Sequence, residues 1–472
     1  MPTVAQSVEA LLRQLAGIAH VDGEQLVIDD AVRFRGEAAA DLAWTAVFSE
    51  DEGAVAAARW VVWEASQELG VRSASIQELY EARGRGEVHG FTVPAINLRA
   101  QTYDMARTVL DAAKAADVGA MIFELARSEQ TYTFQRPIDY STAVLAAAIS
   151  QDWQHPLFIQ GDHYQFNAKK YAADAEGMTE EIRKACRLAL EAGYRNIDID
   201  SSTLVDLAKP TVDEQQRENY VRAAELAALI RSLEPDLTAG ETVSVGGEIG
   251  EVGKQNSTEE ELRAYLAGYL RELADRAPGA KGISKVSVQT GTSHGGVPLP
   301  GGGVAEVKLD FEVLRRLGEV ARSHGLAGAV QHGASTLPDE LFHRFPAVET
   351  AEIHLATGFQ NELYEHPAFP KELSEQIERW VFENAADERK PDQTDQQFVY
   401  TTRKKAIGPF KRELWDLATK DEILAAQYRK IAFLFTELRV NGSMAMVERY
   451  VRPRPFRRPI PDVLRSTVSA GR

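Results

Sequence analysis

Three histidines follow apolar runs at points where glycines cluster, a combination that is typical of ligands to a catalytic metal. His163 ends the run PLFIQGDH, His294 follows ISKVSVQTGTS, and His332 follows GLAGAVQ. Neutral imidazole is the commonest zinc ligand, and a catalytic zinc takes three protein ligands and leaves one position open. We therefore expect these histidines to hold one Zn²⁺ ion per chain, although each alone could equally be a core or loop residue. Glu248, at the end of TVSVGGEI, is a fourth or alternative ligand, or a hydrogen-bonding partner of one.

Asp162 directly precedes His163, which puts an acid beside the expected metal. A carboxylate there can carry protons to and from a substrate oxygen, which is general acid/base catalysis. Successive side chains of a strand point to opposite faces, so both residues reach one site only if the strand turns or ends there. Gly161 makes such a turn feasible. The alternative is that Asp162 only caps a helix.

Glycines and hydroxyl residues near two of the histidines suit the binding of an anion. Gly291 and Gly295 flank the second histidine, and Gly333 and Ser335 follow the third. Backbone amides and hydroxyls at a turn from strand to helix can bind phosphate, and barrel enzymes commonly bind it after their last two strands. A phosphorylated substrate fits this arrangement, although such turns also serve simply to close loops.

The elements that must position these residues are strands and helices in alternation, beginning near residue 87. This alternation predicts a parallel sheet. Eight candidate strands occupy residues 88–97, 119–125, 156–161, 195–200, 242–249, 283–290, 326–331 and 348–356. The expected helices between them occupy residues 101–117, 139–152, 179–193, 213–233, 258–273 and 310–325. Eight such repeats favour an α/β fold of the closed (β/α)8 TIM barrel type, which brings the carboxyl ends of all strands to one mouth.

We expect three parts in the chain: a helical N-terminal extension at 1–85, a TIM-barrel catalytic domain at 86–366, and a C-terminal helical extension with an arm at 367–472. Apolar residues recur at helical spacing through the first part. Trp60 and Trp63 form a packing face there, for either an intramolecular contact or a dimer. The basic, proline-rich tail is either an arm that reaches another subunit or a frayed terminus.

The composition argues against several classes of protein. A formal charge of −17 and a pI near 5.2 disfavour nonspecific binding of nucleic acid and acidic membranes, because polyanions repel each other. Cys186 is the only cysteine, so neither an intramolecular disulfide nor a cysteine-rich zinc site can form. No apolar run approaches the ~18 residues of a membrane span, and the start lacks a signal-peptide pattern. We expect a cytoplasmic protein without nucleic-acid or membrane partners.

Several short runs share their order with one family of enzymes. They are VPAIN at 93–97, GDH at 161–163, IDIDSS at 197–202, GGEIGEVG at 246–253, GTSHG at 291–295, KLDFEVL at 308–314, HGAST at 332–336 and the strand end at 357–360. Together they resemble the class II, zinc-dependent fructose-bisphosphate aldolase family from about residue 88 to residue 360. The spaced trio of GDH, GTSHG and HGAST is the most specific part of the likeness.

The resemblance implies a metal-dependent aldehyde-lyase that cleaves or forms a ketose (bis)phosphate through a metal-stabilised enediolate, with dihydroxyacetone phosphate and an aldehyde as default products. It implies that the three histidines hold zinc and that Asp162 acts on the 4-hydroxyl or aldehyde oxygen. By the same likeness Gly333 and Ser335 would bind the ketose phosphate, and Gly291 and Gly295 would shape that loop. A sugar-phosphate partner, a place in glycolysis or related carbohydrate metabolism, a monovalent cation and a homo-oligomer (dimer or tetramer) are further implications.

Departures from the family pattern concern the phosphate site. The family's last strand usually reads Lys-x-Asn-Ile-Asp-Thr, whereas this chain has EIHLAT at 352–357, and Glu352 would repel a phosphate. After the second strand an alanine replaces a family serine, with Arg127 beside it. The further candidates for substrate binding are therefore Asn97, Arg127, His354 and Thr357.

A second departure concerns proton transfer. The family's loop glutamate falls in a segment that here reads EVGKQN at 251–256, with amides at the aligned positions, and Glu251 or Glu259 would have to substitute. A remodelled pocket leaves two alternatives to an aldolase. One is a metal-dependent ketose (phosphate) epimerase that works by retro-aldol cleavage and re-addition, and the other is a non-catalytic barrel that binds sugar phosphate.

Overall fold

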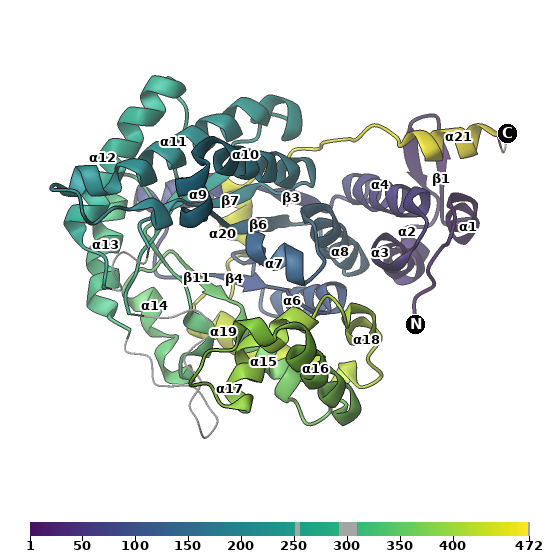
Figure 1. Ribbon diagram of the computed structural model, residues 1–472. Coiled ribbons are helices and arrows are strands. Elements are labelled where there is room, and N and C mark those ends of the chain that lie inside the picture. Colours follow the sequence, from purple (N-terminus) through teal and green to yellow (C-terminus); the bar gives the residue numbers. More distant parts are fainter. Residues whose placement is uncertain (251–254, 292–308, 471–472) are drawn as a thin grey trace.

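Parallel strands close into a (β/α)8 barrel, with extensions at both ends of the chain (Figure 1). The computed structural model describes residues 1–250, 255–291 and 309–470. Each barrel strand pairs with the next one in the chain, and the last pairs with the first. The strands are β4 (Val93–Asn97), β5 (Ile122–Ala126), β6 (Pro156–Gln165), β7 (Asn196–Asp200), β8 (Ser244–Glu248), β9 (Lys285–Ser287), β10 (Ala329–Gln331) and β11 (Glu352–Leu355). Each overlaps one predicted run, so the predicted fold is confirmed.

Helices follow the barrel strands and cover the outside of the barrel (Figure 1). They are α6 (Thr102–Ala115), α7 (Arg127–Tyr132), α8 (Pro137–Ser150), α9 (Ala168–Ala173), α10 (Ala175–Glu191), α11 (Val212–Leu237), α12 (Glu259–Arg276), α13 (Phe311–Ser323), α14 (Arg344–Ala347) and α15 (Thr357–Glu365). The N-caps of α11 and α12 are Thr211 and Thr258, each of which forms a reciprocal capping box with a glutamate three residues later. No helix in the described part of the chain is both long and apolar enough to cross a membrane.

A further strand, β3 (Arg72–Ala74), joins the barrel from before the predicted catalytic domain. Arg72 pairs with Pro156 at the start of β6, whereas β7 pairs with β6 only from Gln160 onward. Asn196 on β7 bridges this junction, because its side-chain amide donates a hydrogen bond of 3.1 Å to the carbonyl oxygen of Ala74. Strand β3 and the following α5 (Gln77–Gly84) therefore lie at the amino-terminal end of the barrel.

The N-terminal extension is mostly helical, as expected, and it also contains a short β-hairpin. Its helices are α1 (Val8–Gln14), α2 (Ala31–Arg33), α3 (Ala39–Phe48) and α4 (Glu52–Glu68). Between α1 and α2 lies an antiparallel hairpin of β1 (Ala19–Asp22) and β2 (Gln25–Ile28). Buried and exposed residues alternate along β1, and Gly23 has a φ of +61° in the two-residue turn. Glycine adopts this conformation without strain, which favours the hairpin over a helix.

The C-terminal part runs beside the barrel and then returns to the N-terminal extension (Figure 1). Its helices are α16 (Lys371–Asn384), α17 (Asp395–Thr402), α18 (Lys411–Trp415), α19 (Lys420–Glu437), α20 (Met444–Tyr450) and α21 (Asp462–Ala470). In the segment before α21, the carbonyl oxygens of Phe456 and Arg458 accept hydrogen bonds from the indoles of Trp63 (2.7 Å) and Trp60 (3.1 Å). The tryptophan face thus packs within the chain, and the tail is an arm bound to its own N-terminal extension.

Candidate active site

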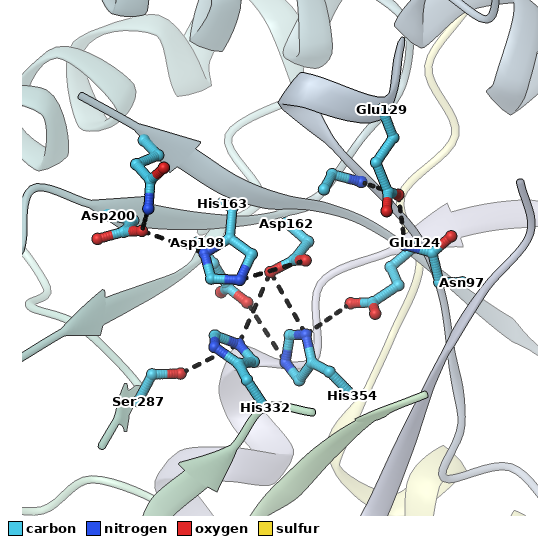
Figure 2. Close-up of polar contacts among 12 residues, drawn as sticks. Asn97, Glu124, Glu129, Asp162, His163, Asp198, Asp200, Ser287, His332 and His354 are labelled. Carbon is cyan, nitrogen blue, oxygen red and sulfur yellow. Dashed lines mark hydrogen bonds and ion pairs between the residues drawn. The ribbon is translucent and has the colours of Figure 1, made fainter. Parts of the chain in front are cut away.

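Strand β6 ends in a bulge that turns Asp162 and His163 toward one space at the barrel mouth (Figure 2). The register with β7 shifts between Gly161 and Tyr164, and His163 has a φ of 44°, in the left-handed region. The turn therefore lies at His163 and not at Gly161. Gly161 serves a different purpose, since a Cβ atom there would lie 2.4 Å from the ring of Tyr164. The bulge explains how neighbouring residues of one strand reach the same site.

Three donor groups converge at the carboxyl ends of β6, β8 and β10. Glu248 Oε2 lies 3.4 Å from His163 Nδ1, and Glu248 Oε1 lies 3.6 Å from His332 Nδ1. Two ligands bound tetrahedrally to one zinc at about 2.1 Å are themselves about 3.4 Å apart, so these separations suit a single ion. One donor atom from each residue lies within 4.8 Å of the others. His294, the remaining predicted ligand, lies outside the described residues.

The charges around these donors favour a cation between them. Burial, together with His354 and His163, lowers the pKa of His332 to about 3, so its imidazole is neutral, the form that binds a metal. Burial opposes ionisation of Glu248, but His163 and His332 hold its pKa well below the usual range. Burial also opposes a charge on His163, yet Asp162 and Glu248 raise its pKa well above the usual value. The carboxylates thus stabilise positive charge at the position that a divalent ion would take.

Polar groups behind the donors fix the orientation of the imidazole rings. Asp200 Oδ2 lies 3.1 Å from His163 Nδ1, the same nitrogen that faces Glu248, and Asp200 Oδ1 accepts a hydrogen bond of 2.7 Å from the hydroxyl of Ser202. Ser287 Oγ lies 3.3 Å from His332 Nε2 (Figure 2). A partner on the other ring nitrogen, as Ser287 is for His332, holds a metal-binding imidazole in one tautomer and orientation.

His354 on β11 adds a second imidazole and carboxylate group beside the first (Figure 2). Its Nδ1 lies 3.3 Å from Asp162 Oδ1 and 3.0 Å from Glu124 Oε2. Burial opposes ionisation of Asp162, but His163 and His354 hold its pKa well below the usual range, which leaves a carboxylate able to accept a proton. Burial raises the pKa of Glu124 to about 7. Asp162, His332 and His354 also lie close enough together to hold an ion.

Charged groups continue from His354 into the barrel interior, which TIM barrels usually fill with apolar side chains. The ammonium of Lys285 lies 2.5 Å from Glu352 Oε1 and 3.0 Å from Asp198 Oδ2. Glu352 Oε1 also lies 2.8 Å from His354 Nε2. Gly246 makes room for this group, because a Cβ atom there would lie 2.2 Å from Asp198 Oδ1. We call Lys285, Asp198 and Glu352 the interior ion cluster.

The sequence did not predict the interior ion cluster, and its structure overturns one expectation about Glu352. Glu352 is fully buried, is neutralised by Lys285 and is absent from the lining of the pocket, so the expectation that it repels a phosphate is wrong. A usable signal was present in the sequence, since Glu124, Asp198 and Lys285 each place a charge within a run that is expected to be a buried barrel strand. Buried charges of this kind are found only where they are paired.

A pocket of about 400 Å³ opens at this mouth, a size that suits a small organic ligand. The predicted substrate residues that line it are Asn97, Arg127, Gly333, Ser335, His354 and Thr357. Asp162, His163 and His332 line it as well. Gly291 is exposed and does not contribute to the lining, and Gly295 lies outside the described residues.

Two of the predicted substrate residues also bind other parts of the protein. Asn97 donates a hydrogen bond of 2.6 Å from its side-chain amide to Glu129. Arg127 donates to Glu181 at 3.0 Å and to the carbonyl oxygen of Gln165 at 3.2 Å. Their places in the wall of the pocket are therefore fixed before any ligand binds.

The loop acids considered for proton transfer do not reach the pocket in the described part of the chain. Glu259 is the first residue of α12, is exposed, and lies 3.7 Å from Arg263 on the same helix. Glu251 lies outside the described residues. In contrast, Arg99 and Lys404 line the pocket although no motif singled them out.

The chain is similar to known proteins in its sequence and in its fold. The family model for fructose-bisphosphate aldolase class-II matches residues 78–410. Among solved structures, the fructuronate-tagaturonate epimerase UxaE from Cohnella laeviribosi matches at 12% identity with a TM-score of 0.55, over 81% of this chain and 85% of that one. A probable tagatose 6 phosphate kinase from Sinorhizobium meliloti 1021 matches at 15% identity with a TM-score of 0.50, over 80% of this chain and 98% of that one. The fructose-bisphosphate aldolase from Campylobacter jejuni matches at 15% identity with a TM-score of 0.45, over 79% of this chain and 99% of that one.

No curated protein sequence matches the chain. With the family model spanning most of its length, the chain belongs to the class-II fructose-bisphosphate aldolase family.

Proposed function

We propose that this protein is a zinc-dependent aldolase that cleaves and forms a ketose phosphate. The observation that supports this most strongly is the convergence of His163, Glu248 and His332, the two histidines lining the same pocket as Asp162. Their donor set, two imidazoles and a carboxylate with room for a further ligand, fits a catalytic Zn²⁺ better than a structural one. The family also supports an enzyme that acts on a small sugar phosphate.

When bound, the metal ion would polarise the ketose carbonyl and stabilise the negative charge that develops on its oxygen. The pocket orients the substrate through the backbone of Gly333 and the hydroxyl of Ser335. Ser287 keeps the imidazole of His332 in place, so that this ring needs little reorganisation when the substrate binds.

Asp162 would move the proton of the reaction. In the cleavage direction its carboxylate accepts the proton of the 4-hydroxyl, and the C3–C4 bond breaks as that oxygen becomes the aldehyde carbonyl. The electron pair of the broken bond stays with the ketose fragment as an enediolate, which then takes up a proton at C3. In the reverse direction Asp162 returns its proton to the aldehyde oxygen. The carboxyl is ionised, the form that can accept a proton, because His163 and His354 outweigh its burial and hold its pKa well below the usual range.

The test is a cleavage assay on the zinc-loaded full chain with a panel of ketose mono- and bisphosphates, followed by NMR. We expect a triose phosphate and an aldehyde from at least one member of the panel, with activity lost after chelation and restored by Zn²⁺. Full activity in the chelated, metal-free protein would exclude the mechanism. Ligand binding without turnover of any panel member would favour a non-catalytic barrel.

An epimerase is a second candidate, which the contact of 3.3 Å between His354 and Asp162 favours. Retro-aldol cleavage followed by re-addition to the other face of the aldehyde needs proton carriers beside the same oxygen, and the family's usual asparagine cannot act as one. One solved structure with this fold is an epimerase of fructuronate and tagaturonate. The same NMR experiment separates the candidates, since an epimerase converts one sugar into its isomer and releases no triose.

A further inference from the structure

One wall of the pocket carries two cationic side chains, one from the barrel and one from the C-terminal extension. Arg99 follows β4, and Lys404 lies on a short 3-10 helix, η6 (Arg403–Ala406), in the C-terminal extension. Arg99 Nη1 lies 3.5 Å from the hydroxyl of Thr357, so this wall adjoins the end of β11. Ser335 lies at the same place, because a Cβ atom on Gly358 would lie 2.5 Å from its carbonyl oxygen. The cations and the predicted phosphate-binding hydroxyls therefore share one side of the pocket.

The backbone around Lys404 is held in place from both sides. Arg403 donates a hydrogen bond of 2.9 Å to Asn361 on α15 and also pairs with Glu365. The amide of Gly408 donates a hydrogen bond of 2.9 Å to the carbonyl oxygen of Tyr132 at the end of α7. Ala406 and Ile407 are buried in an apolar cluster with α15 and α16. A segment anchored in this way presents its side chain at a fixed position.

The ammonium of Lys404 has no hydrogen bond or ion pair with any described residue. Burial and, after it, the charge of Arg99 lower the pKa of Lys404, and Glu129 opposes this shift. Arg99 is itself neutralised by Glu129 at 2.7 Å. The adjacent Lys405 differs, since it pairs with Glu388 and does not line the pocket. The centroid of the Tyr132 ring lies 6.0 Å from this ammonium, which leaves its hydrogen-bonding capacity open to an anionic ligand in the pocket.

We propose that Lys404, supported by Arg99, forms an oxyanion subsite that binds the anionic group of the substrate beside Ser335 and Thr357. The inference rests on the proposed function for the identity of the ligand as a sugar derivative, and a phosphate is the expected group. The subsite supplies the positive charge that the last barrel strand lacks at Glu352. It also gives the C-terminal extension a role in choosing the substrate.

The test measures binding to the zinc-loaded full chain by isothermal titration calorimetry with glycerol 3-phosphate, 3-hydroxypropionate and glycerol. These probes offer a phosphate, a carboxylate and no charge. Lys404→Met is compared with the control Lys405→Met, which removes the same charge one residue away. Loss of one charge-assisted hydrogen bond predicts about tenfold to hundredfold weaker binding of glycerol 3-phosphate to the Lys404 variant alone, with glycerol unaffected.

Each outcome of this titration decides the proposal. A deficit of Lys404→Met confined to 3-hydroxypropionate would support the subsite and assign it to sugar acids. Equal affinities of both variants for both anions would overturn it, as would wild-type protein that binds neither anion. The readout needs no turnover, and zinc is measured in every variant. A Lys404-dependent affinity in a protein that cleaves no ketose would leave the subsite standing and refute the aldolase proposal.

Discussion

Replacing Lys285 by methionine tests whether the interior ion cluster holds the barrel together beneath the active site. The side chain is 2% exposed, and its ammonium lies 2.5 Å from Glu352 and 3.0 Å from Asp198. Methionine keeps the length of the side chain but removes the ammonium that two buried carboxylates share, and leaves them beside His354, whose Nε2 lies 2.8 Å from Glu352 and 3.8 Å from Asp198. Removing one partner of a buried ion pair costs about 3–5 kcal/mol, because the remaining charge is neither solvated nor paired. With an unfolding entropy of about 2.1 cal/mol/K per residue, this predicts a fall in Tm of roughly 3–5 °C.

The control is Lys281→Met, which removes a lysine from a pair of similar length at the surface. Lys281 lies 2.8 Å from Glu81, but its side chain is 54% exposed. An exposed pair contributes at most about 1 kcal/mol, so we expect a change in Tm of no more than about 1 °C. Scanning calorimetry compares the two variants with the wild type. Adding Glu352→Gln to Lys285→Met removes one of the unpaired charges and should restore part of the loss.

Equal Tm values for Lys285→Met and Lys281→Met would refute a stabilising role for the interior ion cluster. It would mean that the buried ammonium contributes no more than a surface charge. A double variant less stable than Lys285→Met would contradict the view that an unpaired Glu352 carboxylate causes the loss.

Three further predictions concern the site itself. Gly161→Ala should lower the zinc content found by metal analysis, because the added Cβ would lie 2.4 Å from the Tyr164 ring. The control Gly36→Ala, whose Cβ would have nothing within 4 Å, should keep its zinc. Equal zinc in both variants would count against the bulge as the feature that positions the ligands. Asp162→Asn should lower kcat by about 10²- to 10⁴-fold with zinc retained, and an unchanged kcat in the cleavage assay would remove Asp162 from proton transfer. Ser335→Ala should raise KM about tenfold with zinc retained, through loss of a hydrogen bond to a charged group, and an unchanged KM would remove Ser335 from the substrate site.

The barrel could be predicted because its strands and helices differ in pattern. A strand buried on both faces leaves a short continuous apolar run, and a helix on the barrel surface leaves an amphipathic one. The hairpin at residues 19–28 was missed although AHVDGEQLVI carries an Asp-Gly pair between alternating residues, because helical patterns flank it closely. Parallel strands bring their carboxyl ends to one mouth, so the meeting of His163, Glu248 and His332 also followed from the pattern.

The remaining features depend on contacts between distant segments, which a single sequence does not encode. The bulge at His163 follows from the packing of Tyr164 against Gly161, and the pattern alone pointed to a turn at the glycine. Lys285 meets Glu352 only because the barrel closes, and neither residue carries a motif. The place of Lys404 in the pocket depends on how the C-terminal extension packs on α7 and α15. Such contacts require a tertiary structure.

The central claim is that one metal ion lies among His163, His332 and Glu248. Anomalous diffraction at the zinc edge from crystals of the zinc-loaded chain tests it most directly. We expect a single strong peak within about 2.3 Å of a donor atom of each of these residues. A peak among Asp162, His332 and His354 instead, or no peak at the barrel mouth, would contradict it.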